Sequence, residues 1–107
     1  MSEIHPTFLK WGNYPSKDKD NPNVLEIVPQ ELETFETEYS INARVTVDGE
    51  EQIIPLQSLE SNNKQLHQLW YHGVEDKKIK IGKKFNLKTW LGISKNARPI
   101  RRFELEF

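Results

Sequence analysis

Apolar and polar residues alternate with a period of two over much of the chain, which is the pattern of half-buried β-strands. The alternation is clearest in residues 41–47, whose apolar face consists of Ile41, Ala43, Val45 and Val47. Residues 23–47 as a whole are rich in β-branched and aromatic side chains. Pro29 interrupts them and marks a bulge, an edge or a break, because proline cannot donate a ladder hydrogen bond. The pattern predicts a mainly β fold.

A two-residue hairpin signal, Asp48-Gly49, follows this strand. A type I′ turn needs positive φ at both central positions, and Asp-Gly tolerates it. With that turn the apolar residues of both strands share one face, which sets the register. The predicted cross-strand pairs are Val47 with Glu50, Ala43 with Ile54, and Ile41 with Leu56.

The period changes to that of a helix in residues 58–73. Its apolar stripe consists of Leu59, Leu66, Leu69 and Trp70. Ser61 or Asn62 can cap the start and Gly73 suits the end, so we expect a helix of about three turns. Period two then returns over residues 78–93, with Gly82 permitting a bulge or bend. A loop over residues 93–99 and a last strand over residues 100–107 complete the chain.

The predicted order is therefore three strands, one helix and two strands. This order resembles the OB-fold, a small five-stranded Greek-key barrel, over residues 24–107. A closed barrel with the helix between the third and fourth strands buries the apolar faces and removes sheet edges. An open α+β sheet crossed by the helix is the rival arrangement. Residues 1–23, with their proline-punctuated polar stretch, form an irregular N-terminal segment outside the single predicted domain.

Composition narrows the class of protein. The 107 residues carry a net charge of −1 and no cysteine, which excludes disulfides, thiolate metal sites and a thiol nucleophile. The chain shows no apolar run long enough for a membrane span and no signal peptide at its start, so we expect a cytoplasmic protein with no membrane partner. Residues 1–60 hold four basic and twelve acidic residues, whereas residues 61–107 hold eleven basic and four acidic. This asymmetry indicates either separate acidic and basic faces or opposite charges paired across a sheet.

The basic residues of the last third accompany an aromatic ring, Trp90. Single-stranded nucleic acid binds to cationic grooves with aromatic stacking platforms. The OB resemblance implies a ligand over strands two and three and the adjoining loops, and residues 92–99 stand in the place of the last such loop. The expected binding residues are Trp90, Lys80, Lys84, Lys88, Lys95, Arg98, Arg101, Arg102, Arg44 and Trp11.

Each of these assignments has a structural alternative. Lysines on outer strand faces also prevent edge-to-edge aggregation, and Trp11 can hold the N-terminal segment down. The sequence pI of about 6.3 is below the value usual for nucleic-acid-binding domains. The second interpretation is a protein-interaction or dimerisation module that docks another protein or a second copy.

Catalysis has little support in the sequence. His67 and His72 are five residues apart and do not share a helix face, so an i,i+4 metal pair is absent. The carboxylates of residues 30–38 resemble a solvated strand face. We therefore expect no enzyme activity, no metal and no cofactor.

Overall fold

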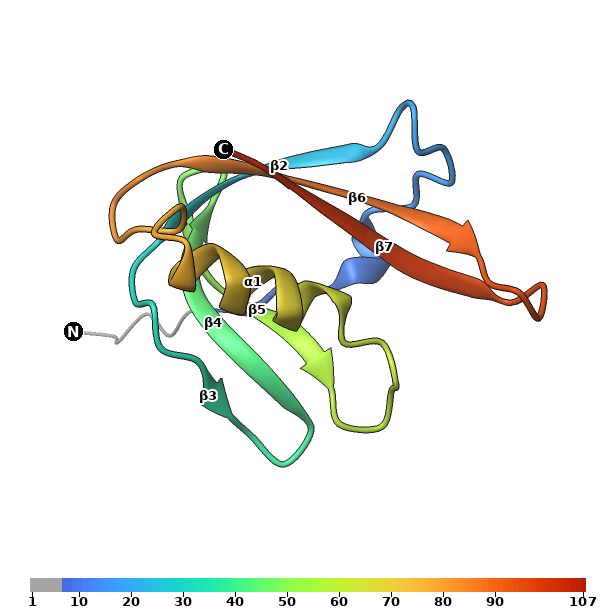
Figure 1. Cartoon of the computed structure of the whole chain (residues 1–107), viewed down its shortest axis with the longest axis horizontal. Helices are drawn as coiled ribbons and strands as arrows, with labels where there is room; N and C mark the ends of the chain where they lie inside the picture. The colour runs from blue at the N-terminus through green and yellow to red at the C-terminus, as the bar shows by residue number, and fades with distance from the viewer. Residues whose placement is uncertain (1–6) are drawn as a thin grey trace.

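The protein, described by a computed structural model over residues 7–107, is built mainly from β-strands (Figure 1). The elements in chain order are β1 (Thr7–Phe8), the 3-10 helix η1 (Trp11–Asn13), β2 (Asn23–Pro29), β3 (Phe35–Glu36), β4 (Ser40–Val47), β5 (Glu50–Ser58), α1 (Gln65–Glu75), β6 (Phe85–Ile93) and β7 (Pro99–Glu106). The strands of seven or more residues pair with one another in antiparallel fashion, whereas β1 runs parallel to β5.

The strands form one open mixed sheet in the order β1-β5-β4-β2-β6-β7, with β3 paired to β4. The expected closed barrel is therefore wrong. The expected five strands and helix position are not matched either, because the described residues contain seven strands and α1 lies between β5 and β6. The two additional strands, β1 and β3, have two residues each. In Figure 1 the sheet curls so that β2, β6 and β7 lie above α1 while β4 and β5 lie below it.

The sheet stays open because other groups occupy the edges that would have to meet. β1 pairs with the edge of β5 through Thr7 and Phe8. On β7, the Asn63 side-chain amide donates to the Arg101 carbonyl at 2.9 Å. The Phe103 N–H donates to the Gln65 side-chain oxygen, also at 2.9 Å. Backbone groups that a closed barrel would pair strand to strand are thus partly satisfied by the N-terminal segment and by the residues entering α1.

Leu9, Trp11 and Tyr14 of the N-terminal segment pack against the core. Leu9 belongs to the core and is 4% exposed. The Trp11 ring meets the Phe103 ring edge-on, with centroids 4.9 Å apart. The expectation of an irregular segment over residues 1–23 falls partly on residues 1–6, which lie outside the described residues; the remainder includes β1 and η1.

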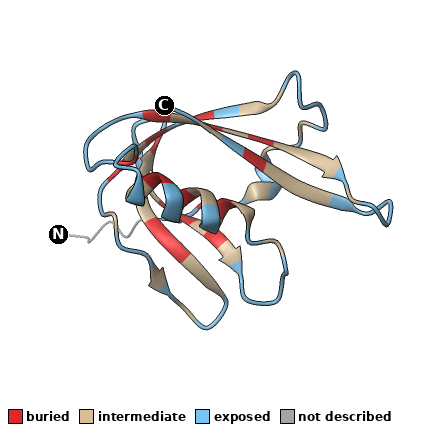
Figure 2. Cartoon of the chain, in the orientation of Figure 1, coloured by how far each residue is buried: buried red, intermediate tan, exposed pale blue. Residues whose placement is uncertain are grey.

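The hydrophobic core lies inside the curled sheet, against α1 (Figure 2). Trp70 is 2% exposed, and its indole N–H donates to the Leu32 carbonyl at 3.1 Å. Its ring is tilted against Phe85 at 6.5 Å between centroids. The core side chains are Leu9, Leu25, Ile27, Ala43, Val45, Val47, Ile54, Leu56, Leu66, Trp70, Ile79, Phe85, Leu87 and Phe103.

The β4–β5 hairpin confirms the Asp48-Gly49 turn, where φ is +50° and +89°. The predicted pairs Val47 with Glu50 and Ala43 with Ile54 are also confirmed. The third pair is wrong, because a register shift between Ile41 and Asn42 places Ile41 opposite Gln57. A β-bulge of this kind inserts one residue and changes which face the following side chains take.

The helix begins and ends later than expected. It has no side-chain N-cap hydrogen bond and runs through Gly73 to Glu75. The strand predicted over residues 78–93 begins only at Phe85, and residues 78–84 form turns before β6. Ile79, expected on a strand, is 1% exposed and belongs to the core. Gly82, with φ of +79°, makes a turn that precedes β6.

Candidate functional site

The candidate surface is the outer face of β6 and β7. Odd-numbered residues of both strands face the core, so even-numbered residues point outward. Across the two strands Trp90 pairs with Arg102, Lys88 with Glu104, and Asn86 with Glu106. The outer face therefore carries both signs of charge.

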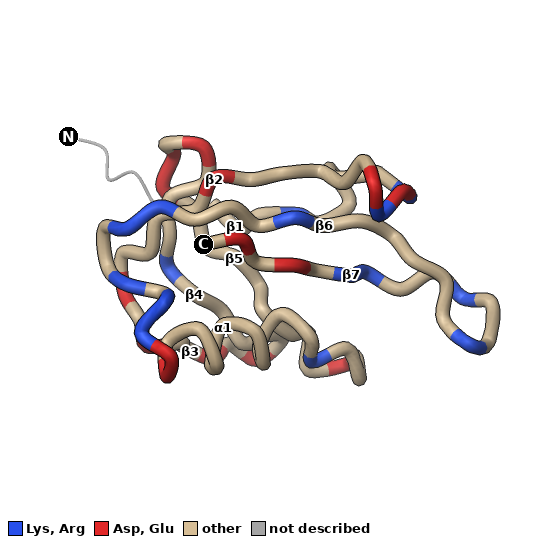
Figure 3. The backbone as a smooth tube through the Cα atoms, turned by 45° about the horizontal axis from the view of Figure 1, so that its top comes forward, with Lys and Arg blue, Asp and Glu red and all other residues tan. Residues whose placement is uncertain are grey.

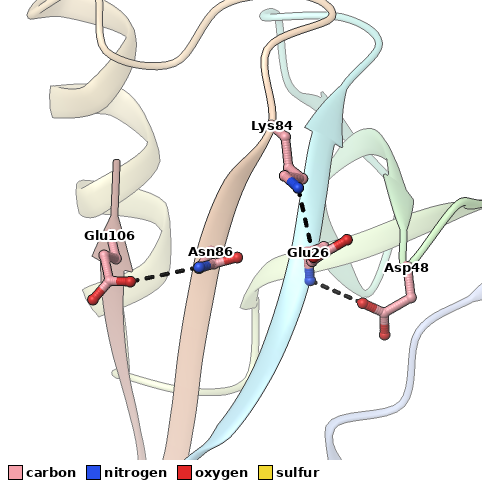
Figure 4. Close-up of polar contacts among 5 residues, drawn as sticks. All are labelled: Glu26, Asp48, Lys84, Asn86 and Glu106. Atoms are coloured by element: carbon pink, nitrogen blue, oxygen red, sulfur yellow. Dashed lines mark hydrogen bonds and ion pairs between the residues drawn. The ribbon is translucent and has the colours of Figure 1, made fainter.

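Two lysines expected to meet phosphates are already ion-paired on this face. Lys84 lies 3.6 Å from the Glu26 carboxylate of β2, and Lys88 lies 2.8 Å from that of Glu106. Figure 4 shows Lys84 reaching Glu26 and Asn86 reaching Glu106. The hydrogen bond and charge of Glu106 raise the pKa of Lys88. Lys88, followed by Asn86, lowers the pKa of Glu106. Neutralisation by Glu side chains reduces what these lysines offer an anionic ligand.

Trp90 and Arg102 line a surface cleft of about 540 Å³. Both side chains are partly exposed. Lys19 of the N-terminal segment also lines this cleft, as does Glu104. Within residues 7–107, neither Arg102 nor Lys19 has a carboxylate within ion-pairing distance. The cleft thus offers an aromatic ring together with two cations.

Sequence reasoning missed Lys19, because the site draws it from the segment that we placed outside the domain. The Leu91 N–H donates to the Ser16 carbonyl at 2.8 Å, which ties this segment to β6. The stretch Lys17 to Asp20 alternates in charge and resembles a solvated loop. No local signal indicated its position beside Trp90.

Lys95 and Arg98 lie in the turn between β6 and β7, beyond Trp90, and both are exposed. The Ser94 N–H donates to the Arg98 carbonyl at 2.8 Å, and Ala97 adopts a φ of +57°. Figure 3 shows basic positions at this tip, at one end of the molecule. The turn therefore extends the cationic surface outward from the cleft.

Arg101 does not share this face, so that part of the expectation is wrong. Arg101 and Arg102 are consecutive residues of one strand, and their side chains point to opposite faces. Two nitrogens of the Arg101 guanidinium donate to the carbonyls of Tyr14 and Trp11, at 2.6 and 2.7 Å. Trp11 is likewise held in place, since its indole N–H donates to the Pro55 carbonyl at 3.0 Å.

The remaining expected residues lie apart from Trp90. Arg44 of β4 is separated from β6 by β2 in the sheet. Its guanidinium lies 4.5 Å from the Phe35 ring centroid and 3.9 Å from the Glu31 carboxylate. Lys80 is exposed in the turns that precede β6. Of the expected set, the structure therefore brings together Trp90 and Arg102 in one cleft, to which it adds Lys19, whereas Lys95 and Arg98 lie further out in the turn between β6 and β7.

Residues 7–107 offer few side-chain arrangements suited to metal binding or catalysis. This part of the chain holds no group of three or more His, Cys, Asp or Glu side chains placed to ligate a metal. The ring Nδ1 of His67 lies 3.2 Å from the Gln57 side-chain oxygen. His5 lies outside the described residues. None of the helices described here has the length and apolar character needed to cross a bilayer.

The chain was compared with protein-family models, with curated proteins and with solved structures, and no match was found in any of the three comparisons.

Proposed function

We propose that this protein is a non-enzymatic, OB-like domain that binds single-stranded nucleic acid on the outer face of β6 and β7. The observation that carries the proposal is the cleft in which partly exposed Trp90 lies with Arg102 and Lys19. A base would stack on the Trp90 ring, and phosphates would meet the cations of the cleft and of the hairpin tip.

The sheet order supports an OB-like arrangement. The long strands are β2, β4, β5, β6 and β7, and β2 pairs with both β4 and β6. The OB-fold is itself a partly open barrel, and its ligands contact the loop between its last two strands. Residues 94–98 form the corresponding loop here and carry Lys95 and Arg98. The site differs from the usual OB face, because it lies over the last two strands instead of the second and third.

The ion pairs on this face determine how many cations can contact phosphates, and so how strongly nucleic-acid binding should depend on salt. Lys84 and Lys88 are ion-paired with Glu26 and Glu106, which makes them less available to phosphates. Lys19, Lys95, Arg98 and Arg102 remain to meet phosphates. Each phosphate contact with single-stranded nucleic acid contributes about −0.7 to the slope of log K against log salt, so four contacts give about −2.8. Raising the salt from about 50 to about 200 mM should then weaken binding roughly 50-fold.

A titration with a mixed-sequence 12-mer DNA at low salt tests the proposal through intrinsic fluorescence and amide chemical shifts. We expect a saturable fluorescence change that Trp90→Phe removes, with shifts confined to β6, β7 and residues 16–20. Trp90→Ala should cost about 1–3 kcal/mol of binding free energy.

The matched control compares two cations of the same face. Arg102→Gln should lower the magnitude of the salt slope by about 0.7, because a phosphate contact is lost. Lys88→Gln should leave it nearly unchanged, because Glu106 already neutralises Lys88. Equal effects of the two substitutions, or no shift at all in β6 and β7, would contradict the proposal.

A second candidate function, protein–protein interaction, rests on a different surface. Phe8, Thr37, Glu38, Tyr39 and Ser40 line a surface hollow of about 660 Å³ between β1 and the turn that joins β3 to β4. Tyr39 is 69% exposed and Phe8 47% exposed, and the two rings line the same hollow, so they form one exposed apolar patch. The mass in solution with and without the oligonucleotide separates the two functions. A dimer that ignores the 12-mer and dissociates on Tyr39→Ser favours the second.

A further inference from the structure

A second cavity lies in the seam between the edges of β5 and β7, on the other side of β7 from the Trp90 cleft. This seam pocket has a volume of about 280 Å³, and its lining includes Trp11, Ser58, Ser61, Asn63, Arg101 and Phe103. The lining contains no acidic side chain. The seam exists because the edges of β5 and β7 are not paired with each other, and pairing of these two edges would abolish it.

Arg101 brings a positive charge into this pocket, whose lining residues include no negatively charged side chain. Its hydrogen-bond partners are the neutral carbonyls of Tyr14 and Trp11 and, at 3.5 Å, the Thr89 hydroxyl. Within residues 7–107 its guanidinium has no carboxylate at ion-pairing distance. Removal from water lowers the pKa of Arg101, yet a guanidinium stays charged in proteins. A partly buried charge without a counter-ion is costly unless something compensates it.

The hydrogen bonds to the Tyr14 and Trp11 carbonyls hold the Arg101 guanidinium in one orientation but do not use all of its N–H donors. A guanidinium carries five N–H donors. Three hydrogen bonds of the Arg101 guanidinium go to the Tyr14 carbonyl, the Thr89 hydroxyl and the Trp11 carbonyl. Within residues 7–107 the other two N–H donors have no hydrogen-bond acceptor. A carboxylate offers two oxygens that match such a fork.

The shape and the polarity of the pocket limit the ligand class. One guanidinium balances one negative charge, whereas a phosphate monoester carries nearly two. Trp11, Pro55 and Phe103 provide apolar walls, while Ser58, Ser61 and Asn63 provide polar groups. The volume of about 280 Å³ is just below the range of about 300–1,000 Å³ for small-molecule sites, so the ligand must be small. We propose that the seam pocket binds a carboxylate group attached to a small apolar body, with Arg101 as its charge partner.

Such a carboxylate has two sources, a free small acid or the C-terminus of a peptide, and the probes separate them. Benzoate represents the first, and N-acetyl-Gly-Phe with a free carboxyl terminus represents the second. Benzamide and the C-terminal amide of the same peptide are the neutral controls. Amide and indole resonances report binding, because the Trp11 indole N–H lies at the seam, bonded to Pro55.

We expect saturable shifts of the Trp11 indole, Asn63 and Phe103 resonances with at least one carboxylate probe. Its neutral counterpart should bind at least about tenfold more weakly, because a charged hydrogen-bonded pair is lost. Arg101→Gln should remove the binding, and Arg101→Lys should retain part of it.

Two measurements keep a folding defect apart from a binding defect. Arg101→Gln also loosens the carbonyls of Trp11 and Tyr14, so its thermal unfolding is compared with that of the native chain. Ser58→Phe fills the pocket from an exposed position and leaves Arg101 in place, so it should abolish binding in a folded protein. The proposal is overturned when neither carboxylate shifts these resonances at about 20 mM, or when the amides or the Ser58→Phe variant bind equally well. Oligonucleotide binding is unaffected by these outcomes, since Arg102 and Trp90 face the other side of β7.

Discussion

Replacing Gly73 with alanine should not stabilise the protein, although Gly73 lies within a helix. A Cβ atom added there would lie 2.6 Å from the Cδ1 and 2.7 Å from the Cγ1 atom of Ile79, closer than real Cβ contacts. Ile79 is 1% exposed and belongs to the core, so it has little room to withdraw. The Gly73 carbonyl also accepts hydrogen bonds from the Lys78 and Ile79 N–H groups, which holds the chain close to the helix.

Two opposing effects set the magnitude. Replacing an interior helical glycine with alanine stabilises a free helix by about 1 kcal/mol. Overpacking a tight core costs about 1–3 kcal/mol. The Gly73→Ala variant should therefore unfold with a free energy between about 0 and 2 kcal/mol lower than that of the native chain. Urea denaturation followed by circular dichroism, with an unchanged m-value, measures it.

A double-mutant cycle isolates the contact. Ile79→Ala alone should cost about 2–5 kcal/mol through the cavity it leaves. In that background Gly73→Ala should become stabilising by about 1 kcal/mol, because the opposing atoms are gone and the helix propensity is recovered. Gln68→Ala, on the exposed side of the same helix, should change stability by less than about 0.5 kcal/mol. A Gly73→Ala variant that gains about 1 kcal/mol with Ile79 intact would refute the close approach.

Three further predictions concern other parts of the molecule. Trp70→Phe should lower the free energy of unfolding by about 1–3 kcal/mol, because it leaves the Leu32 carbonyl without its donor; urea denaturation tests this, and an unchanged midpoint would contradict it. Because the pKa of Glu106 is lowered in the folded protein, its contribution to stability is present above the unfolded pKa and is lost as the pH falls through the folded value. Stability curves between about pH 2 and pH 6 should thus show a weaker acid dependence for Glu106→Gln than for the native chain. Replacing both Lys95 and Arg98 with Gln should reduce the salt slope of oligonucleotide binding from about −2.8 to about −1.4, and an unchanged slope would remove the hairpin tip from the site.

The candidate site was predictable in part. Trp90 and Arg102 could be placed on one face because strand residues alternate between two faces, whatever the fold. The same rule separates Arg101 from Arg102, and applying it to the last strand would have removed Arg101 from the expected surface. The pairing of Lys84 with Glu26 could not be predicted, because it joins residues whose strands become neighbours only through the sheet order.

Gly73 illustrates the limit for the helix. A glycine near the end of an apolar stripe is read as a C-cap, since glycine adopts left-handed conformations easily. Here the helix continues through it, and the absence of a side chain serves the approach of Ile79. A glycine near the end of a helix can serve either as a C-cap or as room for a close neighbour, and only the tertiary structure shows which role applies.

The amino-acid sequence by itself determined the mainly β character of the chain, the presence of one α-helix and the Asp48-Gly49 turn, because these depend on backbone torsions and on alternation between neighbouring residues. The tertiary structure alone decided that the sheet stays open, that Lys19 lies beside Trp90, and that a pocket forms around Arg101. Those features depend on contacts between residues far apart in the chain, such as the pairing of β1 with β5 and the hydrogen bonds from Arg101 to Trp11 and Tyr14, and no local pattern records them.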